Sequence, residues 1–354
     1  MDTFFASPEA QICRQLSEAS RGRGPRIVRP PAAADPVQEF ARSSATGLAS
    51  PPRRLESRFL YDAQGSILFD QITAQPEYYL TRTEASILAA NAARIRTLTG
   101  PVNIVELGAG SAAKTDHLLR AWLERSKTAC YFPVDVSLTA LLGACKSIST
   151  RFPAARVIAV NSEYGEAFSL LSQLSPVLVT FLGSSIGNFS RPEMTSFCLA
   201  LAASMQPGDF FLLGLDLVKR SSVLEAAYND RAGVTGRFTR NIFARMNREL
   251  GCAIDLESIE HSARYRAELE QIEIDACFTK QQTFLLHPPG RAITIAEGES
   301  VRTEISRKFR LERVIPELNR CGFGTEQVFS DERRWFALLL LRRLPRYCGQ
   351  SGRS

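Results

Sequence analysis

Short apolar runs alternate with amphipathic stretches over residues 102–216 of this 354-residue chain. The apolar runs have the length and the continuous hydrophobicity of strands that are buried on both faces. The stretches between them place apolar residues at helical spacing. The predicted strands are 102–107, 130–136, 156–160, 177–182 and 209–216, and the predicted helices are 112–125, 137–149, 166–173 and 191–204. This alternation predicts a parallel, doubly wound α/β sheet with helices on both faces.

The chain before this repeat is less regular. Residues 1–48 are rich in Arg, Ala, Pro and Ser and show little periodicity. We expect a largely irregular segment there, with one short helix near Glu9–Ala19. Thr83 is followed by apolar positions at helical spacing from Ala85 to Ile95, which predicts the start of a helix.

The strand–helix rhythm breaks after Lys219. The elements predicted beyond it are a helix over 221–250, antiparallel strands over 267–278 and 282–287, a helix over 308–320 and a strand over 335–341. The last two resume the sheet, so residues 220–306 form an insertion. We expect the insertion to pack with residues 49–82 as a second lobe over the strand ends.

A glycine turn joins the first predicted strand to its helix. Glycine lets backbone approach a ligand closely, and a helix start leaves N–H groups free. Glu106, just before the turn, is a residue that a buried strand takes only for a polar task. Asp135 ends the second strand 27 positions after Gly108, where a βαβ unit holds ribose hydroxyls. The third glycine of the dinucleotide fingerprint is missing, which favours a nucleoside ligand such as S-adenosylmethionine.

Composition narrows the functional class. Hydrophobic residues make up 45% and charged residues 23% of the chain, as in globular proteins. No run approaches the roughly 20 apolar residues of a membrane span, and the start lacks a signal-like apolar region. We therefore expect a cytoplasmic protein without a membrane partner. The eight cysteines and three histidines show no metal-ligand spacing, so no metal is expected. The net charge of +6 comes without aromatic–basic interleaving, which argues against a nucleic-acid partner.

Several separated segments give a more specific indication. They read FLYDAQGSILFDQIT (59–73), PEYYLTRTE (76–84), VELGAGS (105–111), FLGSSIGN (181–188), LGLDLVK (213–219), YND (228–230), FTRN (238–241) and TEISRKF (303–309). Together they resemble the histidine-specific, S-adenosylmethionine-dependent methyltransferases of ergothioneine biosynthesis, over roughly residues 50–342. The resemblance implies a class I (Rossmann-like) methyltransferase sheet with an inserted second lobe that binds the substrate.

The activity that the resemblance implies is trimethylation of the α-amino group of L-histidine to hercynine, with S-adenosylmethionine as methyl donor. The implied division of the chain is an irregular segment 1–48, a substrate-binding lobe of 49–82 plus 220–306, and a cofactor-binding domain of 83–219 plus 307–345. The residues that it assigns to the cofactor are Gly108, Lys114, Asp135, Glu163 and Tyr164. The family usually has Asp-Phe where this chain has Glu163-Tyr164, so the charge and the aromatic ring are kept.

The resemblance also assigns residues to the amino-acid substrate. These are Tyr78, Asn188, Tyr228, Glu304, Ile305 and Ser306, among which Asn188 and Tyr228 orient the amine. Glu304 and Ser306 lie two positions apart, so in an extended segment both face one side and can grip the two imidazole nitrogens. A buried carboxylate rejects apolar rings because it would be left unpaired.

Three neighbouring positions carry less weight. Tyr61 and Phe69 are weaker candidates for the walls of the site. Ile274 falls near a position that often carries methionine in the family, and isoleucine is an apolar wall of similar size.

Two other functions stay open. One is an N-methyltransferase for tryptophan or another aromatic amino acid, against which Glu304 argues. The other is a non-catalytic protein that binds S-adenosylmethionine as a sensor. Against it stands the presence of both the cofactor-side and the substrate-side segments. We expect a monomer, because the fold of the family is self-contained.

Overall fold

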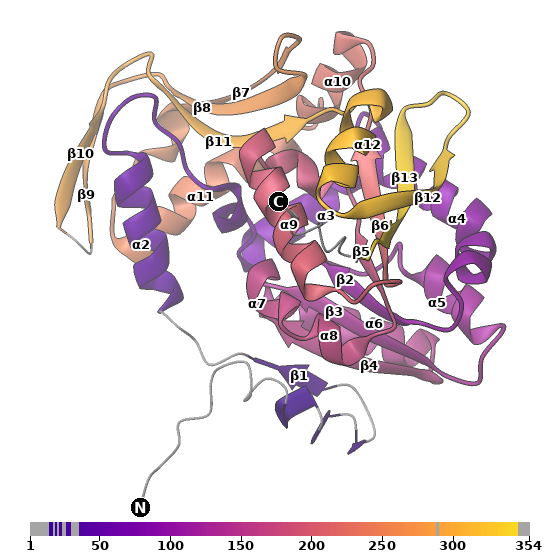
Figure 1. Cartoon of the computed structure of the whole chain (residues 1–354). Coiled ribbons are helices and arrows are strands. Elements are labelled where there is room, and N and C mark those ends of the chain that lie inside the picture. The colour runs from indigo at the N-terminus through magenta and orange to yellow at the C-terminus, as the bar shows by residue number, and fades with distance from the viewer. Residues whose placement is uncertain are drawn as a thin grey trace, which may run out of the picture.

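A single large sheet forms the centre of the computed structural model, which describes residues 14–16, 18–19, 21–22, 26–29, 35–287 and 290–345 (Figure 1). The eight strands follow the order β1-β4-β3-β2-β5-β6-β13-β12. Their bounds are β1 (Arg26–Val28), β2 (Asn103–Leu107), β3 (Ala129–Asp135), β4 (Ala155–Asn161), β5 (Val177–Phe181), β6 (Phe210–Asp216), β12 (Phe323–Ser330) and β13 (Phe336–Arg343). Strand β13 is antiparallel to both neighbours, and the pairs from β1 to β6 are parallel.

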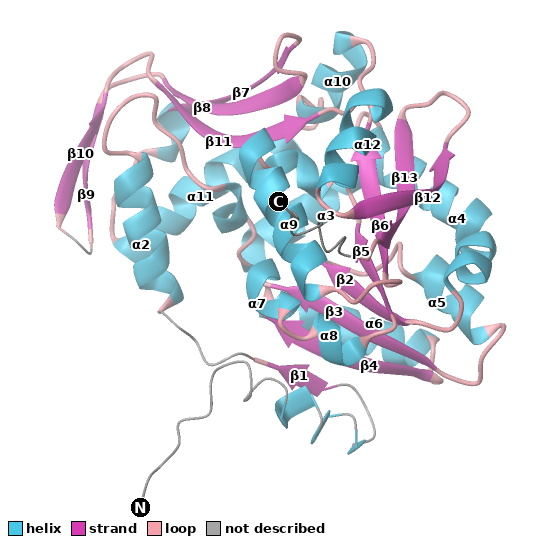
Figure 2. Ribbon diagram, viewed as in Figure 1, coloured by secondary structure: helices cyan, strands magenta, loops and turns pink. Residues whose placement is uncertain are grey.

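The order β4-β3-β2-β5-β6 is the 3-2-1-4-5 order of a doubly wound sheet, which confirms the predicted α/β class. Helices cover both faces (Figure 2). One face carries α4 (Tyr79–Thr99), α5 (Asp116–Leu123) and α6 (Leu138–Arg151), and the other carries α7 (Tyr164–Phe168), α8 (Leu171–Leu174), α9 (Arg191–Ser204) and α12 (Leu311–Arg320). The neighbours Ile104 and Val105 of β2 belong to different cores because successive strand residues point to opposite faces.

The chain between β6 and α12 builds a further layer, seen along the top and the left side of Figure 1. Its elements are α10 (Ser221–Tyr228), α11 (Val234–Leu250), β7 (Ile259–Arg266), β8 (Gln271–Phe278), β9 (Gln282–Leu286), β10 (Arg291–Ile295) and β11 (Ser300–Arg307). Strands β11, β8 and β7 make an antiparallel sheet, and β9 and β10 a hairpin. The earlier helices η1 (Ser57–Leu60) and α3 (Ala63–Thr73) pack on α11. Phe243 and Ile272 of this layer share one hydrophobic core with Leu88 of α4.

The N-terminal segment is more ordered than the sequence predicts. Helix α2 (Pro36–Gly47) begins at a cap in which Asp35 accepts a hydrogen bond from the Val37 N–H at 2.9 Å. Its buried face consists of Phe40 and the small residues Ala41, Ser44 and Ala45, so only one large apolar side chain marks this face in the sequence. Strand β1 forms backbone hydrogen bonds with the edge of β4. This pairing could not be predicted from residues close to β1 in the sequence. The irregular segment expected over 1–48 is therefore wrong for these parts. In the predicted helix Glu9–Ala19, residues 14–16 and 18–19 are helical and the others lie outside the described residues.

The predicted helix 221–250 is two helices. Asp230 interrupts it by accepting hydrogen bonds from the N–H groups of Val234 and Thr235 at 2.7 and 2.8 Å, and it thereby caps α11. Gly233 in the break has a φ of +66°, which favours glycine. The strand predicted over 267–278 begins only at Gln271, because residues 267–270 form a turn. This turn connects it to β7, a strand that the sequence did not predict.

Three other predicted helices have different bounds. The helix predicted from residue 112 begins at Asp116, since Ala112 has a φ of 53°. The helix predicted over 166–173 is split into α7 and α8. Helix α4 begins at Tyr79, four residues before Thr83.

Candidate functional site

The carboxyl ends of β2, β3 and β4 bring the predicted cofactor residues to one edge of the sheet. The Asp135 carboxylate ends β3 and accepts the N–H of Gly110 at 2.9 Å and the N–H of Ser137 at 2.8 Å. Burial raises the pKa of Asp135, and these two backbone bonds oppose the rise. Each carboxylate oxygen retains a lone pair for a further donor. Asp135 is thus held as an acceptor pair facing the glycine turn.

Gly108 and Tyr164 meet at this edge. Gly108 has a φ of +67°, and a Cβ atom there would lie 2.9 Å from the Tyr164 hydroxyl. The Tyr164 ring is fixed by an edge-on contact with Phe181, with centroids 5.2 Å apart. A side chain at position 108 would therefore fill the space between the turn and the ring.

Glu163 is joined to a part of the chain that sequence reasoning did not connect with it. Its half-exposed carboxylate pairs with the guanidinium of Arg58 in η1. Arg58 also contacts Glu39 of α2 at 2.7 Å and Glu56 at 2.8 Å. One arginine therefore links the cofactor edge to the segment that precedes α3.

Lys114 has a partner that the sequence analysis missed. Its ammonium pairs with Glu84 of α4, a side chain with no exposed surface. The Glu84 carboxylate also accepts the N–H of Gly183 at 2.8 Å, which positions the loop after β5. The available signal was a glutamate on the apolar face of a predicted helix, which a fold buries only with a partner.

A cavity between the central sheet and the upper layer holds most of the predicted substrate residues. It is lined by Tyr61, Phe69, Ile72, Tyr78, Gly183, Ser184, Ser185, Asn188, Tyr228, Thr235, Phe238, Glu304 and Ser306. Five of the six predicted substrate residues are among these, as are the weaker candidates Tyr61 and Phe69. Ile305 is half-buried and does not line the cavity, since it alternates with its neighbours along β11.

Glu304 is the acidic side chain of this cavity. Its Oε1 accepts a hydrogen bond from the Asn188 amide at 2.9 Å. Burial raises the pKa of Glu304 to about 7, although Lys308 and Asn188 lower it. A register shift in β11 lies directly before Glu304, and such bulges redirect side chains. Ile274 of β8 stands opposite Glu304 in the strand pair but is not among the residues that line the cavity.

Beneath the cavity lies a buried polar cluster. The hydroxyls of Tyr228 and Ser306 are 2.8 Å apart, and the Lys308 ammonium donates to both at 2.8 Å. Lys308 also pairs with Asp216 at 2.9 Å, and neither of these two charged side chains has exposed surface. Sequence reasoning did not single out Lys308. Its signal was the spacing Glu304, Ser306, Lys308, which follows one face of an extended strand.

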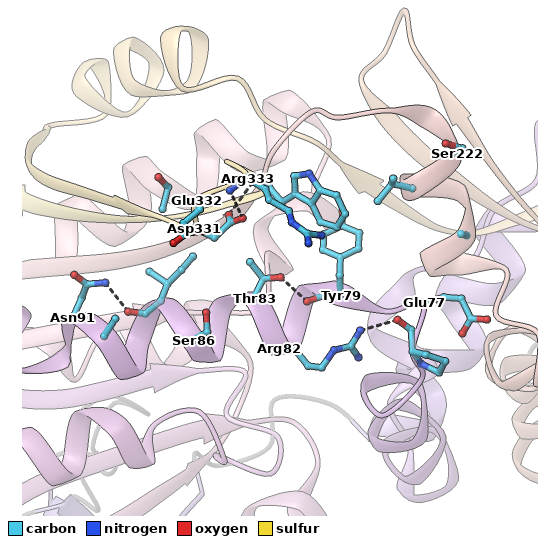
Figure 3. Close-up of a pocket in the computed structure, with 17 residues that line it drawn as sticks. Glu77, Tyr79, Arg82, Thr83, Ser86, Asn91, Ser222, Asp331, Glu332 and Arg333 are labelled. Carbon is cyan, nitrogen blue, oxygen red and sulfur yellow. Dashed lines mark hydrogen bonds between the residues drawn. The ribbon is translucent and has the colours of Figure 1, made fainter.

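A second hollow lies on the outside of the molecule, between α4, α10 and residues 330–335 (Figure 3). Tyr79 separates it from the buried cluster: its ring contacts Trp335 edge-on at 5.1 Å, and its hydroxyl donates to Asp216 at 2.8 Å. Among the residues that the structure describes, none of the predicted site residues lines this hollow. It is therefore separate from the candidate site.

Within the described residues, no helix is both long and apolar enough to cross a membrane. In that same part of the chain, no group of three or more His, Cys, Asp or Glu side chains is placed to hold a metal ion.

The sequence is similar to those of known methyltransferases. The family model described as histidine-specific methyltransferase, SAM-dependent, matches residues 40–343. The histidine N-alpha-methyltransferase of Mycolicibacterium smegmatis is 39% identical over 312 residues, which cover 88% of this chain and 97% of that protein. The histidine N-alpha-methyltransferase of Mycobacterium tuberculosis is 36% identical, over 84% of this chain and 93% of that protein. Ergothioneine biosynthesis protein 1 of Neurospora crassa is 29% identical, over 56% of this chain and 23% of that protein.

Proposed function

Because this chain belongs to the family of histidine-specific, S-adenosylmethionine-dependent methyltransferases, we propose that it transfers three methyl groups in turn to the α-amino nitrogen of L-histidine. The product is hercynine, and the reaction opens ergothioneine biosynthesis. The observation that carries this proposal is the Glu304 carboxylate, which is the one acidic group among the residues that line the cavity and whose pKa is raised by burial.

The cofactor edge fits S-adenosylmethionine, which when bound supplies an electrophilic methyl group on a sulfonium sulfur. Asp135 offers two carboxylate oxygens to the ribose hydroxyls, and Glu163 offers an acceptor to the adenine amine. Gly108 leaves space beside the Tyr164 ring. Lys114 can meet the cofactor's carboxylate from its place between the glycine turn and the loop after β5.

Glu304 and Ser306 together support histidine over tryptophan as substrate. The Glu304 carboxylate can accept a hydrogen bond from the imidazole N–H, and the Ser306 hydroxyl can meet the second ring nitrogen, which indole lacks. The cavity is built mainly by residues 49–82 and 220–306, which supply Tyr78, Tyr228 and Glu304. We propose that these two segments form the substrate-binding lobe and that residues 83–219 and 307–345 bind the cofactor.

The protein contributes mainly orientation to the chemistry. The attacking amine must be neutral, and each methyl transfer releases one proton to solvent. Asn188 and Tyr228 hold the amine in line with the methyl group. We therefore expect Asn188→Ala to lower kcat about tenfold at saturating histidine. Single-turnover assays measure this, and a variant that keeps normal turnover would show that Asn188 does not orient the amine.

The test of the function is methyl transfer to a panel of free amino acids, with the products weighed by mass spectrometry. We expect three methyl groups on histidine and little transfer to tryptophan or tyrosine. Transfer to another amino acid would overturn the substrate assignment. Binding of the cofactor without any transfer would favour the sensor function.

We further propose that the protein works as a monomer in the cytoplasm on this small-molecule substrate, without a nucleic-acid or membrane partner. Four described cysteines, Cys145, Cys198, Cys252 and Cys321, are buried free thiols, which is typical of a reducing compartment. Light scattering at assay concentration tests the monomer, for which a mass of 39.2 kDa is expected.

A further inference from the structure

Lys308 is a buried cation that the reaction described above does not use. It follows β11 directly, and its side chain has no exposed surface. Its three ammonium hydrogens have three acceptors, namely Asp216 at 2.9 Å, Tyr228 at 2.8 Å and Ser306 at 2.8 Å. An ammonium donates and cannot accept, so both hydroxyls receive a hydrogen bond from Lys308.

Because Lys308 donates to both hydroxyls, it limits which hydrogen bonds the Tyr228 and Ser306 hydroxyls can themselves donate. Tyr228 and Ser306 also bond to each other at 2.8 Å. A phenol is a stronger acid than an aliphatic alcohol, so the Tyr228 hydroxyl is the donor to Ser306. Both lone pairs of the Ser306 oxygen are then occupied, one by Lys308 and one by Tyr228. Its proton has no acceptor among the described residues and is free for the cavity that Ser306 lines.

The end of the cavity therefore carries two different groups. Glu304 accepts, and Ser306, two residues further along β11, donates. A neutral imidazole has one N–H donor and one nitrogen acceptor, whereas an imidazolium has two donors. We propose that Lys308 is a positioning residue that makes the Ser306 hydroxyl a donor to the unprotonated ring nitrogen, so that the site selects neutral imidazole. This inference rests on the proposed function.

Charged and polar side chains surround Lys308. Asp216 faces it directly and also binds Tyr79 at 2.8 Å and the ammonium of Lys219. Burial and the charge of Asp216 raise the pKa of Tyr228 well above its ordinary value, which keeps the phenol protonated. Lys308 also lowers the pKa of Glu304, which favours the acceptor form of that carboxylate.

The chain offers a matched pair of variants. Lys308→Met removes the donor to Tyr228 and Ser306 but leaves Asp216 bound to Tyr79 and Lys219. Lys219→Met removes the second lysine that pairs with Asp216. Lys219 makes no hydrogen bond to the hydroxyl of Tyr228 or of Ser306, so it is the matched control. We expect Lys308→Met to raise the KM for histidine at least about tenfold with a much smaller change in kcat. Lys219→Met should leave that KM within about twofold.

A ligand whose ring contains no nitrogen distinguishes a loss of the Ser306 hydrogen bond from general damage to the site. We would measure binding of histidine and of thienylalanine to each variant in the presence of S-adenosylhomocysteine. Lys308→Met should weaken histidine binding and leave thienylalanine binding nearly unchanged. An equal loss for both ligands, or an equal KM effect in Lys219→Met, would overturn the proposal.

The wild-type protein gives an independent test that holds even where Lys308→Met does not fold. Histidine labelled with ¹⁵N in its ring is bound together with S-adenosylhomocysteine, and its nitrogen resonances are recorded. Two widely separated signals, as for a neutral ring, are expected. Two close signals, as for imidazolium, would overturn the role of Lys308 while leaving the proposed function intact. A wild-type protein that does not bind histidine would instead overturn the proposed function.

Discussion

The cofactor edge and the substrate cavity are built in different ways. The cofactor edge comes from one continuous stretch, in which Gly108, Asp135 and Tyr164 follow successive parallel strands. Its key carboxylate is held by backbone N–H groups. The substrate cavity takes Tyr78, Asn188 and Glu304 from distant parts of the chain.

The two sites also differ in their support. Beneath the cavity, Lys308 and Asp216 form a charged pair with no exposed surface. The comparison indicates that the sheet and its backbone N–H groups place Gly108 and Asp135, whereas the substrate groups depend on one another. Substitutions should therefore stay local at the cofactor edge and affect neighbouring groups in the cavity.

The largest effect is expected at Glu304. Glu304→Ala should lower kcat/KM for histidine about 100-fold, because the ring N–H loses a charged acceptor. The affinity for S-adenosylhomocysteine, measured by calorimetry, should not change. Glu260→Ala, an exposed acid on β7, serves as the control. A matching loss of cofactor affinity would show that the two sites are not separate.

The converse substitution is Asp135→Ala. It should weaken binding of S-adenosylhomocysteine about 30-fold, through the loss of charge-assisted bonds to the ribose. The KM for histidine at saturating cofactor should change less than about threefold. A large rise in that KM would contradict the local character of the cofactor edge.

A lower pH should weaken substrate binding through protonation of Glu304. Burial raises its pKa to about 7, so the acceptor form is lost as the pH falls below neutrality. Binding of hercynine, which has no titrating amine, should weaken about tenfold from pH 8 to pH 6 through this group. Ring protonation of the ligand acts in the same direction. Glu304→Gln keeps only the ligand's contribution, and an unchanged pH profile in that variant would contradict the assignment.

The smallest effect is expected at Arg58, which links Glu163 to Glu39 and Glu56. These side chains are partly exposed, so water screens their attraction. Arg58→Ala should weaken cofactor binding about threefold, because Glu163 loses its orientation. Isothermal titration measures this change. Tighter binding would instead show that Arg58 competes with the adenine amine.

The parts that the sequence predicted are those governed by local patterns. The alternation of strands and helices and the placement of Asp135 after a strand follow from residues close together in the chain. The pairing of Lys114 with Glu84 could not be predicted, because 30 positions separate them and no repeat relates the two. Lys308 lies inside a segment that carries the family resemblance, but the sequence does not show its role. Its partner Asp216 is distant in the sequence, and only the fold brings the two side chains together.

The three-residue strand β1 has a consequence for association of the protein. It pairs with residues Ile158–Val160 of β4, which are buried and apolar. An uncovered β4 would present a row of unpaired backbone groups at the margin of the sheet, which is a template for pairing with another chain. Strand β1 pairs with this row of groups and is itself only three residues long. It therefore leaves a shorter edge at which another chain could pair.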